Sequence, residues 1–576
     1  MDIQLKKNRI FFLVFSLFLT LLFCWPWLAR DFVGIEHDTL FHLSRIDAFS
    51  EALFHGDLIP RIYPYENFGY GYASPMFYCD FFLILPSVLY HFGLPLSSAY
   101  VLTCMLTVFA STYAVACLCE RITENPMASA VVSAAFCFAN YHITDIYVRS
   151  ALGEAMALVF LPILLEGLYI LFQEQKEEGG VLLFLGLTGL ILSHNLTFLM
   201  GAILAVLFFV MFAQDLRGKL ILSFFLAFLA AFLVTAWFTL PMVEQLASQD
   251  FYLGYYGSSS DLENYALEPW QYLRNTTVFG YGSNTMDSER QMTMNIGYFL
   301  TLAPLTFLLP SNHQKKDQPF ILLCLILGYI LLFLPIRWFP WKSMRFLRII
   351  QFPWRLLTVS MVLLTIPSAC GIHALFQSQK LPYAFLSVLL CAEGVFHVAP
   401  VLNRSFGITS ANSYSDLLSG ELIDPCFSAT YVRVQLAGGE YLPSGSPDFR
   451  ELPPAIRSSS LEETGIPFQK NRTSITFHVD HAPDDGTLIL PLSWYHGYSL
   501  KDSPEGTVLT ASNEKLAELD GVKEGTYTVV YGGTILQKLS AVFSLLSSLA
   551  LLFWKMKRKL FPSAGFPAAE KTERTV

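Results

Sequence analysis

Charged residues are scarce in this chain of 576 residues, because Asp, Glu, Lys and Arg together make up only 14% of it. Soluble globular proteins carry about a quarter of their residues as charged side chains. A chain with 53% hydrophobic residues and so little charge cannot cover itself with a water-compatible surface. This composition excludes a soluble fold and intrinsic disorder, and it predicts an integral membrane protein.

An excess of basic residues is also missing. The 37 Lys and Arg residues stand against 46 Asp and Glu residues, and the formal net charge is −9. Proteins that bind nucleic acids present a basic face to the phosphates, so we expect no nucleic-acid partner. The sequence also lacks paired Cys-x-x-Cys motifs of a zinc site, and eight of its ten cysteines fall within apolar runs.

Long apolar runs are abundant instead. A helix that crosses the hydrocarbon core, about 30 Å thick, needs about 20 apolar residues. Twelve stretches meet or approach this length: 10–29, 98–119, 127–141, 152–172, 180–193, 196–213, 218–240, 293–310, 319–336, 356–376, 381–400 and 536–554. The stretch 78–92 is shorter and contains Pro86, so we interpret it as an interfacial or re-entrant helix. The fold class expected is therefore an α-helical polytopic membrane protein with about 12 spans.

Basic residues lie in alternate loops between these stretches and predict the orientation of the chain. They are Arg121, Lys176, Arg217, Lys219, Lys315, Lys316, Lys380, Lys555, Lys557, Arg558 and Lys559. Short basic loops stay in the cytosol, so we expect a multi-pass protein of the cell membrane with both termini cytosolic. The same parity places the following segments outside: 30–97, 142–151, 241–292, 337–355 and 401–535.

The segment 401–535 differs from the rest of the chain. Runs of alternating or β-branched residues at 474–480, 487–492 and 526–531 are separated by Gly, Pro and Asp, which is typical of strands and turns. We therefore expect an extracytoplasmic β-rich domain at 401–535. It follows a multi-span membrane domain at 1–400, whose first outer loop is 30–97, and precedes a final span with a basic cytosolic tail at 536–576.

Polar residues in the first outer loop are spaced for one helix face. Asp38, His42 and Arg45 stand at i, i+4 and i+7, and the same face continues with apolar residues. This pattern predicts a packed, membrane-proximal pocket that contains a carboxylate, an imidazole and a guanidinium. The alternative is that Asp38 only caps the helix while His42 and Arg45 are solvated.

Two further outer segments carry polar residues with two interpretations each. Asp145 and Arg149 stand four residues apart within 141–154, and they form either a local ion pair or a second acidic group of the same pocket. His194 lies between two apolar stretches in Ser193-His-Asn195, where it either lines a cavity or caps two helices.

The outer segment 337–355 contains basic residues and no acidic ones, on the side where positive charge is normally scarce. Its basic residues are Arg337, Lys342, Arg345, Arg348 and Arg355. Arginine forms paired charged hydrogen bonds with phosphate oxygens, so the segment is suited to hold a lipid-linked phosphate. General attraction to anionic lipid headgroups is the alternative.

Several motifs in this order resemble those of bacterial GT-C superfamily glycosyltransferases, in the branch of YfhO-like and 6-pyruvoyl-tetrahydropterin synthase-related membrane proteins. The motifs are Glu36-His-Asp-Thr-Leu-Phe-His42, Ser74-Pro-Met-Phe-Tyr78, Arg149-Ser-Ala-Leu-Gly-Glu154, Ser193-His-Asn-Leu196 and Gln351-Phe-Pro-Trp-Arg355. The resemblance implies a GT-C-like fold with its cleft at the outer membrane face. It also implies inverting glycosyl transfer from a polyprenyl-phosphate-linked sugar donor to a glycan or envelope polymer, within membrane lipids.

Such a transfer needs a carboxylate that removes the proton of the acceptor hydroxyl. The family's first-loop acid falls on Asp38, and we expect His42 and Asp145 to support it. Cations stabilise the leaving lipid phosphate. The expected substrate-binding residues are Arg45, Arg149, Arg345, Arg348, Arg355 and His194.

Relatives carry an acidic pair where this chain has His37-Asp38, which leaves the need for a metal open. A divalent metal ion is the one cofactor that the sequence leaves open, with Glu36, Asp38 and Asp145 as its oxygen ligands.

Two other classes of function compete with a transferase. One is a multi-span transporter or lipid flippase, and the other is an envelope scaffold that displays the β-rich domain. Transporters place polar residues near the bilayer midplane. This chain concentrates its charge in outer loops, which favours chemistry at the membrane surface.

Overall fold

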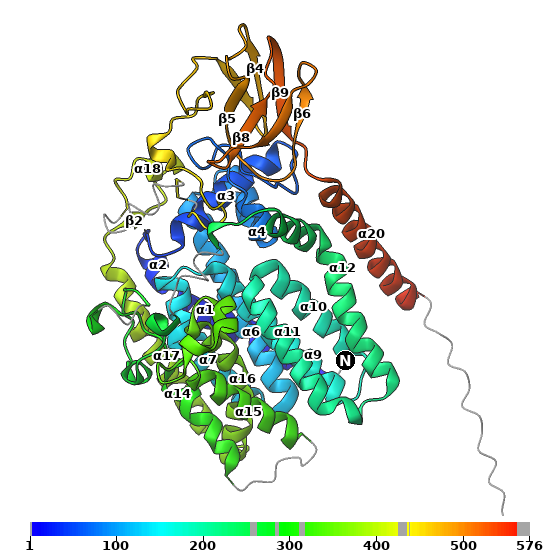
Figure 1. Ribbon diagram of the computed structural model, residues 1–576. Coiled ribbons are helices and arrows are strands. Elements are labelled where there is room, and N and C mark those ends of the chain that lie inside the picture. The colour runs from blue at the N-terminus through cyan, green and yellow to red at the C-terminus, as the bar shows by residue number, and fades with distance from the viewer. Residues whose placement is uncertain are drawn as a thin grey trace, which may run out of the picture.

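The computed structural model describes residues 3–253, 262–282, 287–309, 317–423, 435–436 and 438–560. Most of this part is helical, and strands gather at one end of the molecule (Figure 1). The longer helices are α1 (Ile3–Phe23), α3 (Thr39–Phe54), α6 (Leu96–Thr123), α7 (Pro126–Cys137), α9 (Leu152–Phe172), α10 (Glu178–Ser193), α11 (Asn195–Phe212), α12 (Gly218–Ser248), α15 (Gln318–Phe333), α16 (Leu356–Phe376), α17 (Lys380–Val398) and α20 (Ile535–Leu560). The shorter ones are α2 (Trp25–Ala29), α4 (Ser74–Phe77), α5 (Ile84–His91), α8 (Asn140–Ile143), α14 (Gly297–Leu302) and α18 (Tyr414–Leu418).

Seven helices in the described ranges are long and apolar enough to cross a membrane, or eight if one bent pair counts as a span. They are Leu96–Thr123, Leu152–Phe172, Asn195–Asp215, Gly218–Ser248, Pro353–Phe376, Lys380–Asn403 and Ile535–Phe553, and the bent pair is Pro126–Cys137 with Asn140–Val148. The protein is therefore a helical membrane protein.

The predicted count of twelve spans is not confirmed. The expected spans 180–193, 293–310 and 319–336 correspond to the shorter apolar helices Glu178–Ser193, Gly297–Leu308 and Gln318–Phe333. The expected span 10–29 falls on α1 and α2, which are not among the seven helices. A helix of 16 residues, such as α10, reaches only about 24 Å. The stretch 78–92 forms α5 after one turn of 3-10 helix, and it is too short to cross.

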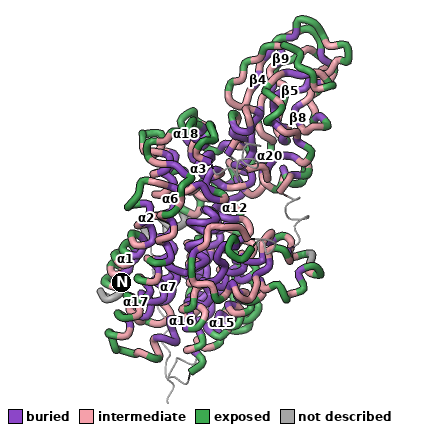
Figure 2. Tube along the Cα trace, turned by 90° about the vertical axis from the view of Figure 1, so that its left-hand side faces the viewer, coloured by how far each residue is buried: buried purple, intermediate pink, exposed green. Residues whose placement is uncertain are grey.

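The core of the bundle forms around α16, which is buried along nearly its whole length from Leu356 to Ile372. Helix α16 packs against α15, α6, α7 and α9, and α9 packs against α10. Buried residues concentrate in the interior of this bundle (Figure 2). Helix α16 is apolar on all of its faces, which is typical of a buried helix. Helices α17 and α20 expose apolar side chains on the outside of the bundle, where they can contact lipid.

The three predicted strands are confirmed as β4 (Ser474–Val479), β5 (Thr487–Ser493) and β9 (Gly525–Tyr531). They belong to two antiparallel sheets, β3-β4-β9-β6 and β5-β8-β7, with β3 (Phe468–Asn471), β6 (Tyr498–Asp502), β7 (Val508–Ala511) and β8 (Leu516–Asp520). The sheets share a core that includes Phe477, Leu488 and Tyr527. Both sheets lie within 468–531, so the described part of 401–467 is not β-rich; it holds α18 and β2 (Gly407–Ile408).

The first outer loop (30–97) and the segment 401–535, called the C-terminal segment below, are packed together. Strand β1 (Val33–Gly34) pairs with β2, and Tyr72, Phe77, Tyr441 and Tyr495 share one buried cluster. From β9 the chain returns along α12 as α20 (Figure 1). The C-terminal segment therefore helps to shape whatever site the first outer loop forms.

We expect Gly186→Ala to destabilise the bundle by about 1–3 kcal/mol, because overpacking has this cost. A Cβ atom at Gly186 on α10 would lie 2.8 Å from the Cα and Cβ atoms of Leu164 on α9. Thermal unfolding in detergent micelles measures the effect. The matched control is Gly218→Ala, since a Cβ at Gly218 meets nothing within 4 Å. Equal stability of the two variants would contradict the close approach of α9 and α10.

Candidate functional site

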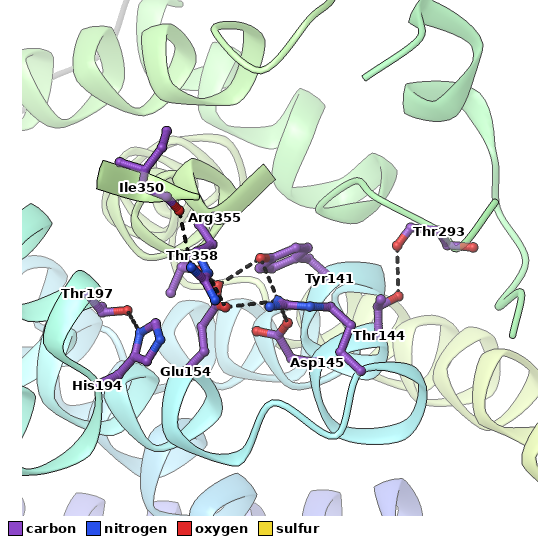
Figure 3. A network of polar contacts seen from close by, with 11 residues as sticks. Tyr141, Thr144, Asp145, Glu154, His194, Thr197, Thr293, Ile350, Arg355 and Thr358 are labelled. Atoms are coloured by element: carbon purple, nitrogen blue, oxygen red, sulfur yellow. Dashed lines mark hydrogen bonds and ion pairs between the residues drawn. The ribbon is translucent and has the colours of Figure 1, made fainter. Parts of the chain in front are cut away.

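A buried ion network lies where α9 begins (Figure 3). The chain makes a π-helical turn at Thr144–Val148 and passes through Arg149 into α9, which brings Asp145, Arg149 and Glu154 together. Arg149 Nη1 donates to Asp145 Oδ1 at 2.5 Å and to Glu154 Oε2 at 2.9 Å. The three side chains are at most 6% exposed. The local ion pair of Asp145 and Arg149 is therefore present, and it is buried within a larger network.

Glu154 is the central acceptor of this network. Its Oε1 accepts hydrogen bonds from Tyr141 Oη at 2.8 Å and from Thr358 Oγ1 at 2.5 Å. Its Oε2 accepts from Arg149 and lies 3.5 Å from Arg355 Nε. Side chains from α8, α9 and α16 thus converge on one carboxylate. Two guanidinium groups face two carboxylates, which compensates the charges of groups that are largely removed from water.

Arg355 connects the network to a cavity of about 540 Å³. Arg348, Gln351 and Arg355 line this cavity together with His194 and Tyr78, so the basic segment meets the loop between α10 and α11 there. Gln351 Oε1 accepts a hydrogen bond from Arg355 Nη1 at 2.5 Å. The backbone of Gln351 has a φ of 62°, which is rare for a residue other than glycine. Strain of this kind is maintained only by the structure around it, and it marks functional sites.

Aromatic rings form another wall of this cavity. Phe77 and Tyr441 both line it, and their rings stack with centroids 5.2 Å apart and planes within 2°. Tyr441 belongs to the C-terminal segment and Phe77 to the first outer loop. Closure of the cavity therefore depends on both segments.

His194 faces the same cavity from the start of α11. Its Nδ1 and the hydroxyl of Thr197 are 2.7 Å apart, and the side chain is 9% exposed. Of its two interpretations, the structure places His194 at a cavity wall, and it makes no side-chain cap to the helix backbone.

Asp38 lies close to the network but makes no capping hydrogen bond. It occupies the N-cap position of α3, and its backbone N–H donates to Arg149 O at 3.0 Å. Its side chain is accessible to water, yet protein surrounds it on its other sides, and this desolvation raises the pKa of the carboxyl to about 7. Arg149 lowers the pKa and Glu440 raises it. Asp38 does not line the cavity, but it lies close enough to Arg149 and Arg355 for both cations to lower the pKa of its carboxyl.

His42 and Arg45 are buried and bonded behind the cavity. Arg45 Nε donates to Asp80 Oδ1 at 2.8 Å, and Arg45 Nη1 lies 3.1 Å from His42 Nδ1. Tyr63 donates to Asp80 Oδ2 at 2.5 Å. The Arg45 guanidinium lies 4.3 Å from the ring centroid of Tyr78, which lines the cavity. The solvated alternative for His42 and Arg45 is wrong, and their contacts suit support of Tyr78 better than contact with a substrate.

The three carboxylates named as metal ligands are not brought together. Glu36 pairs with Arg404 and Asp145 pairs with Arg149. No group of three His, Cys, Asp or Glu residues that could hold a metal ion occurs among the described residues. The residues present therefore do not fit a metal-ligand set, and no step is assigned to a metal ion.

The basic segment is divided by the fold. Arg348 and Arg355 line the cavity, whereas Arg337 and Lys342 pair with Glu268 and Glu263. The side chain of Arg345 lies outside the described residues. Only part of the predicted phosphate-binding cluster therefore faces the cavity.

Several residues of the site were not predicted from the sequence: Tyr78, Asp80, Tyr141, Glu154, Gln351, Thr358 and Tyr441. Tyr78, Glu154 and Gln351 lie within motifs quoted for the resemblance, and Asp80 is a charge at the start of an apolar stretch, so these four had a signal. Thr358 and Tyr441 had none, because threonine and tyrosine are ordinary residues in a helix and a loop.

Comparisons with known proteins are sparse. No family model matches the chain. An uncharacterized protein of Lactococcus lactis subsp. cremoris (strain MG1363) is 26% identical over 358 residues, which cover 58% of this chain. The chain spans about half (55%) of the length of that relative.

Two solved structures of the arabinofuranosyltransferase AftD from Mycobacteria are also similar. One has a TM-score of 0.46 and covers 92% of this chain and 40% of AftD. The other, of a mutant, has a TM-score of 0.42 and covers 72% and 30%. Sequence identity is 12% in both. Both TM-scores are below 0.5, so the similarity assigns no function to this chain.

We expect Glu154→Gln to lower the free energy of unfolding by about 3–5 kcal/mol, because it leaves buried guanidinium groups without their central anion. Thermal unfolding in detergent measures this loss. The control is Asp448→Asn, which removes the charge from an exposed pair with Arg450, where about 1 kcal/mol or less is at stake. If both variants lost the same stability, Glu154 would not be the centre of a structural network.

Proposed function

We propose that the protein is a GT-C-like glycosyltransferase of the YfhO-like branch. It transfers a sugar from a polyprenyl-phosphate carrier to a glycan or polymer of the cell envelope. The observation that carries this proposal is a cavity with an arginine wall, whose Arg355 interacts electrostatically with Asp38, a water-accessible carboxyl with a pKa of about 7. Arginines suit the phosphate of the donor, and a carboxyl that titrates near neutral pH suits a general base.

In the proposed reaction, the oxygen of an acceptor hydroxyl attacks the anomeric carbon of the donor while Asp38 takes up the hydroxyl proton. The bond between the anomeric carbon and the phosphate oxygen breaks, and its electron pair leaves with the polyprenyl phosphate. Attack from the face opposite the leaving group inverts the configuration at that carbon. Each turnover thus forms one glycosidic bond and releases one proton and one lipid phosphate.

Arg348 and Arg355 are the proposed partners of the leaving phosphate. Arg355 is held in place by Gln351, by the carbonyl of Ile350 at 3.2 Å and by Glu154. A cation that is already in position when charge develops stabilises the transition state without further rearrangement. Asp145 and Arg149 have a positioning role in this proposal. Arg149 binds Glu154 through its guanidinium and the backbone N–H of Asp38 through its carbonyl, and Asp145 pairs with Arg149.

We place this reaction at the outer membrane face, with both termini in the cytosol and twelve crossings. The alternation of basic loops supports the orientation. In this topology α10, α14 and α15 cross as short helices, which a tilted or locally thinned bilayer accommodates. The sheets and the first outer loop lie at one end of the bundle (Figure 1), in agreement with an extracytoplasmic module on that side.

We expect Asp38→Asn to reduce glycosyl transfer by about 10²–10⁴-fold, the usual contribution of a general base. Mass spectrometry of envelope glycans measures this in cells whose own copy is deleted. In the parent, kcat/KM should fall about tenfold per pH unit below pH 7, because Asp38 must be ionised to accept a proton.

The control for this prediction is Asp484→Asn, which changes an exposed carboxylate in the β-rich segment. Both variants should insert and unfold like the parent. Near-normal product from Asp38→Asn would remove Asp38 from the mechanism.

We expect Arg348→Glu to raise the donor concentration at half-maximal rate by about tenfold or more, with little change for the acceptor. A charged hydrogen bond contributes about 1.5–3 kcal/mol, and 1.4 kcal/mol corresponds to a factor of ten. Transfer assays in vesicles, with donor and acceptor varied separately, provide the measurement.

Lys342→Glu is the matched control, because Lys342 lies in the same basic segment but pairs with Glu263 at 2.6 Å away from the cavity. If both charge reversals weakened donor use equally, the segment would act by general attraction to anionic lipids and not through a phosphate site.

A further inference from the structure

A second cavity, of about 370 Å³, opens beside the first outer loop. It lies between α3, the loop at 62–66, α18 and the turn that joins β3 to β4. The small side chains of Ala48 and Ala52 on α3 leave room for it. Its volume falls in the range of small-molecule sites. The cavity of about 540 Å³ that is lined by Arg348 and Arg355 is called the donor cavity below. None of its lining residues lines the second cavity.

The walls of the second cavity, called the acidic cavity below, contain more acidic than basic side chains. Asp47, Glu51, Asp57 and Glu66 contribute carboxylates, and Arg472 is the one basic residue among those that line it. Arg472 lies 3.8 Å from Asp57. The other three carboxylates are left without a cation within the cavity wall. A cationic ligand would therefore be attracted to this place.

Glu66 points to a ligand more directly than the charge count does. Its side chain is only 6% exposed, and its Oε1 accepts a hydrogen bond from Tyr414 Oη at 2.9 Å. Among the described residues its Oε2 has only the neighbouring hydroxyl of Ser44 as a polar partner, without the geometry of a full hydrogen bond, and burial raises the pKa of this carboxyl to about 8. A buried carboxylate oxygen without a full hydrogen bond is costly. A ligand that donates a hydrogen bond would satisfy it.

The arrangement excludes a simple metal site. No group of three carboxylate or other ligating residues close enough to hold one metal ion exists within the described ranges. The acidic groups therefore suit a ligand that spans several of them. Tyr63, Tyr65 and Tyr414 also line the cavity, and tyrosine rings and hydroxyls favour contact with cations and with sugar hydroxyls.

We propose that the acidic cavity binds a sugar unit that carries a free ammonium group. In this proposal the sugar unit belongs to the glycan that accepts the transferred sugar, and this part rests on the proposed function. The ammonium group contacts Glu66, while Asp47 and Glu51 attract it through their charge, and the hydroxyl groups of the sugar contact the tyrosines. Phosphate-bearing chains are rejected by the same carboxylates.

One buried chain of contacts joins the acidic cavity to the donor cavity. Tyr63 lines the acidic cavity and donates to Asp80 at 2.5 Å. Asp80 pairs with Arg45 at 2.5 Å, and the guanidinium of Arg45 lies 4.3 Å from the ring centroid of Tyr78 on the donor side. Tyr63, Asp80, Arg45 and Tyr78 thus stand in series between a ligand of the acidic cavity and a ligand of the donor cavity.

The test uses the full chain in nanodiscs of neutral lipid and two glucosamine tetramers, one fully deacetylated and one fully N-acetylated. Titration calorimetry should show binding of the deacetylated tetramer and at least about tenfold weaker binding of the N-acetylated one, because only the first carries ammonium groups. Glu66→Gln should weaken binding of the deacetylated tetramer about tenfold. Equal binding of both tetramers would overturn the proposal.

Two controls keep the result decisive. Glu505→Gln changes an exposed glutamate of the β-rich segment and should leave the affinity for the deacetylated tetramer unchanged. If it lost as much affinity as Glu66→Gln, the binding would be non-specific attraction to an acidic protein, and the proposed site would be overturned. Glu51→Gln changes an exposed residue of α3, so folding is not at risk, and it should also weaken binding. An unchanged affinity in Glu51→Gln and Glu66→Gln together would overturn the proposal.

Binding and transfer are measured separately in this design. Loss of transfer with intact tetramer binding would contradict the proposed function and leave the acidic cavity in place. Absence of tetramer binding with intact transfer would contradict the acidic cavity alone.

Discussion

Burial of two arginines against two acids at the start of α9 is the constraint on which the rest of the site depends. Arg149 and Arg355 converge on Glu154, and Asp145 balances the second positive charge. None of these groups could be desolvated alone, so the helices that carry them must meet in one arrangement. That arrangement sets the position of Arg355 at the donor cavity and, through a backbone hydrogen bond, the position of Asp38 beside Arg149.

The site is assembled from segments that are far apart in the chain. Residues from the first outer loop, from the α10–α11 junction and from the basic segment meet at the donor cavity, and Tyr441 adds a wall from the C-terminal segment. Pairing of β1 with β2 and the shared aromatic cluster hold these outer segments together. The C-terminal segment is therefore part of the site and not only an appendage. A mutation far from the cavity, in the β1–β2 pair, would act on the same geometry.

The Arg45–Asp80 pair occupies the layer between the two cavities. Its buried charges are satisfied by Tyr63 on one side and lie against Tyr78 on the other. Because a fully bonded buried pair is rigid, it fixes the spacing between the donor cavity and the acidic cavity. The two cavities differ in charge, with arginines lining one and carboxylates the other, so ligands of opposite charge are favoured in the two.

The sequence alone determined the membrane class and the strands at 474–480, 487–492 and 526–531, because composition and periodicity are local properties. It could not determine how many apolar runs form full-length spans, since helix length depends on packing. It also could not separate the roles of neighbouring polar residues. Asp38 and His42 share one predicted helix face, yet one reaches water and the other is sealed behind Tyr78. Only the tertiary structure decides such burial, because it depends on partners such as Asp80, Thr358 and Tyr441, which come from distant parts of the chain.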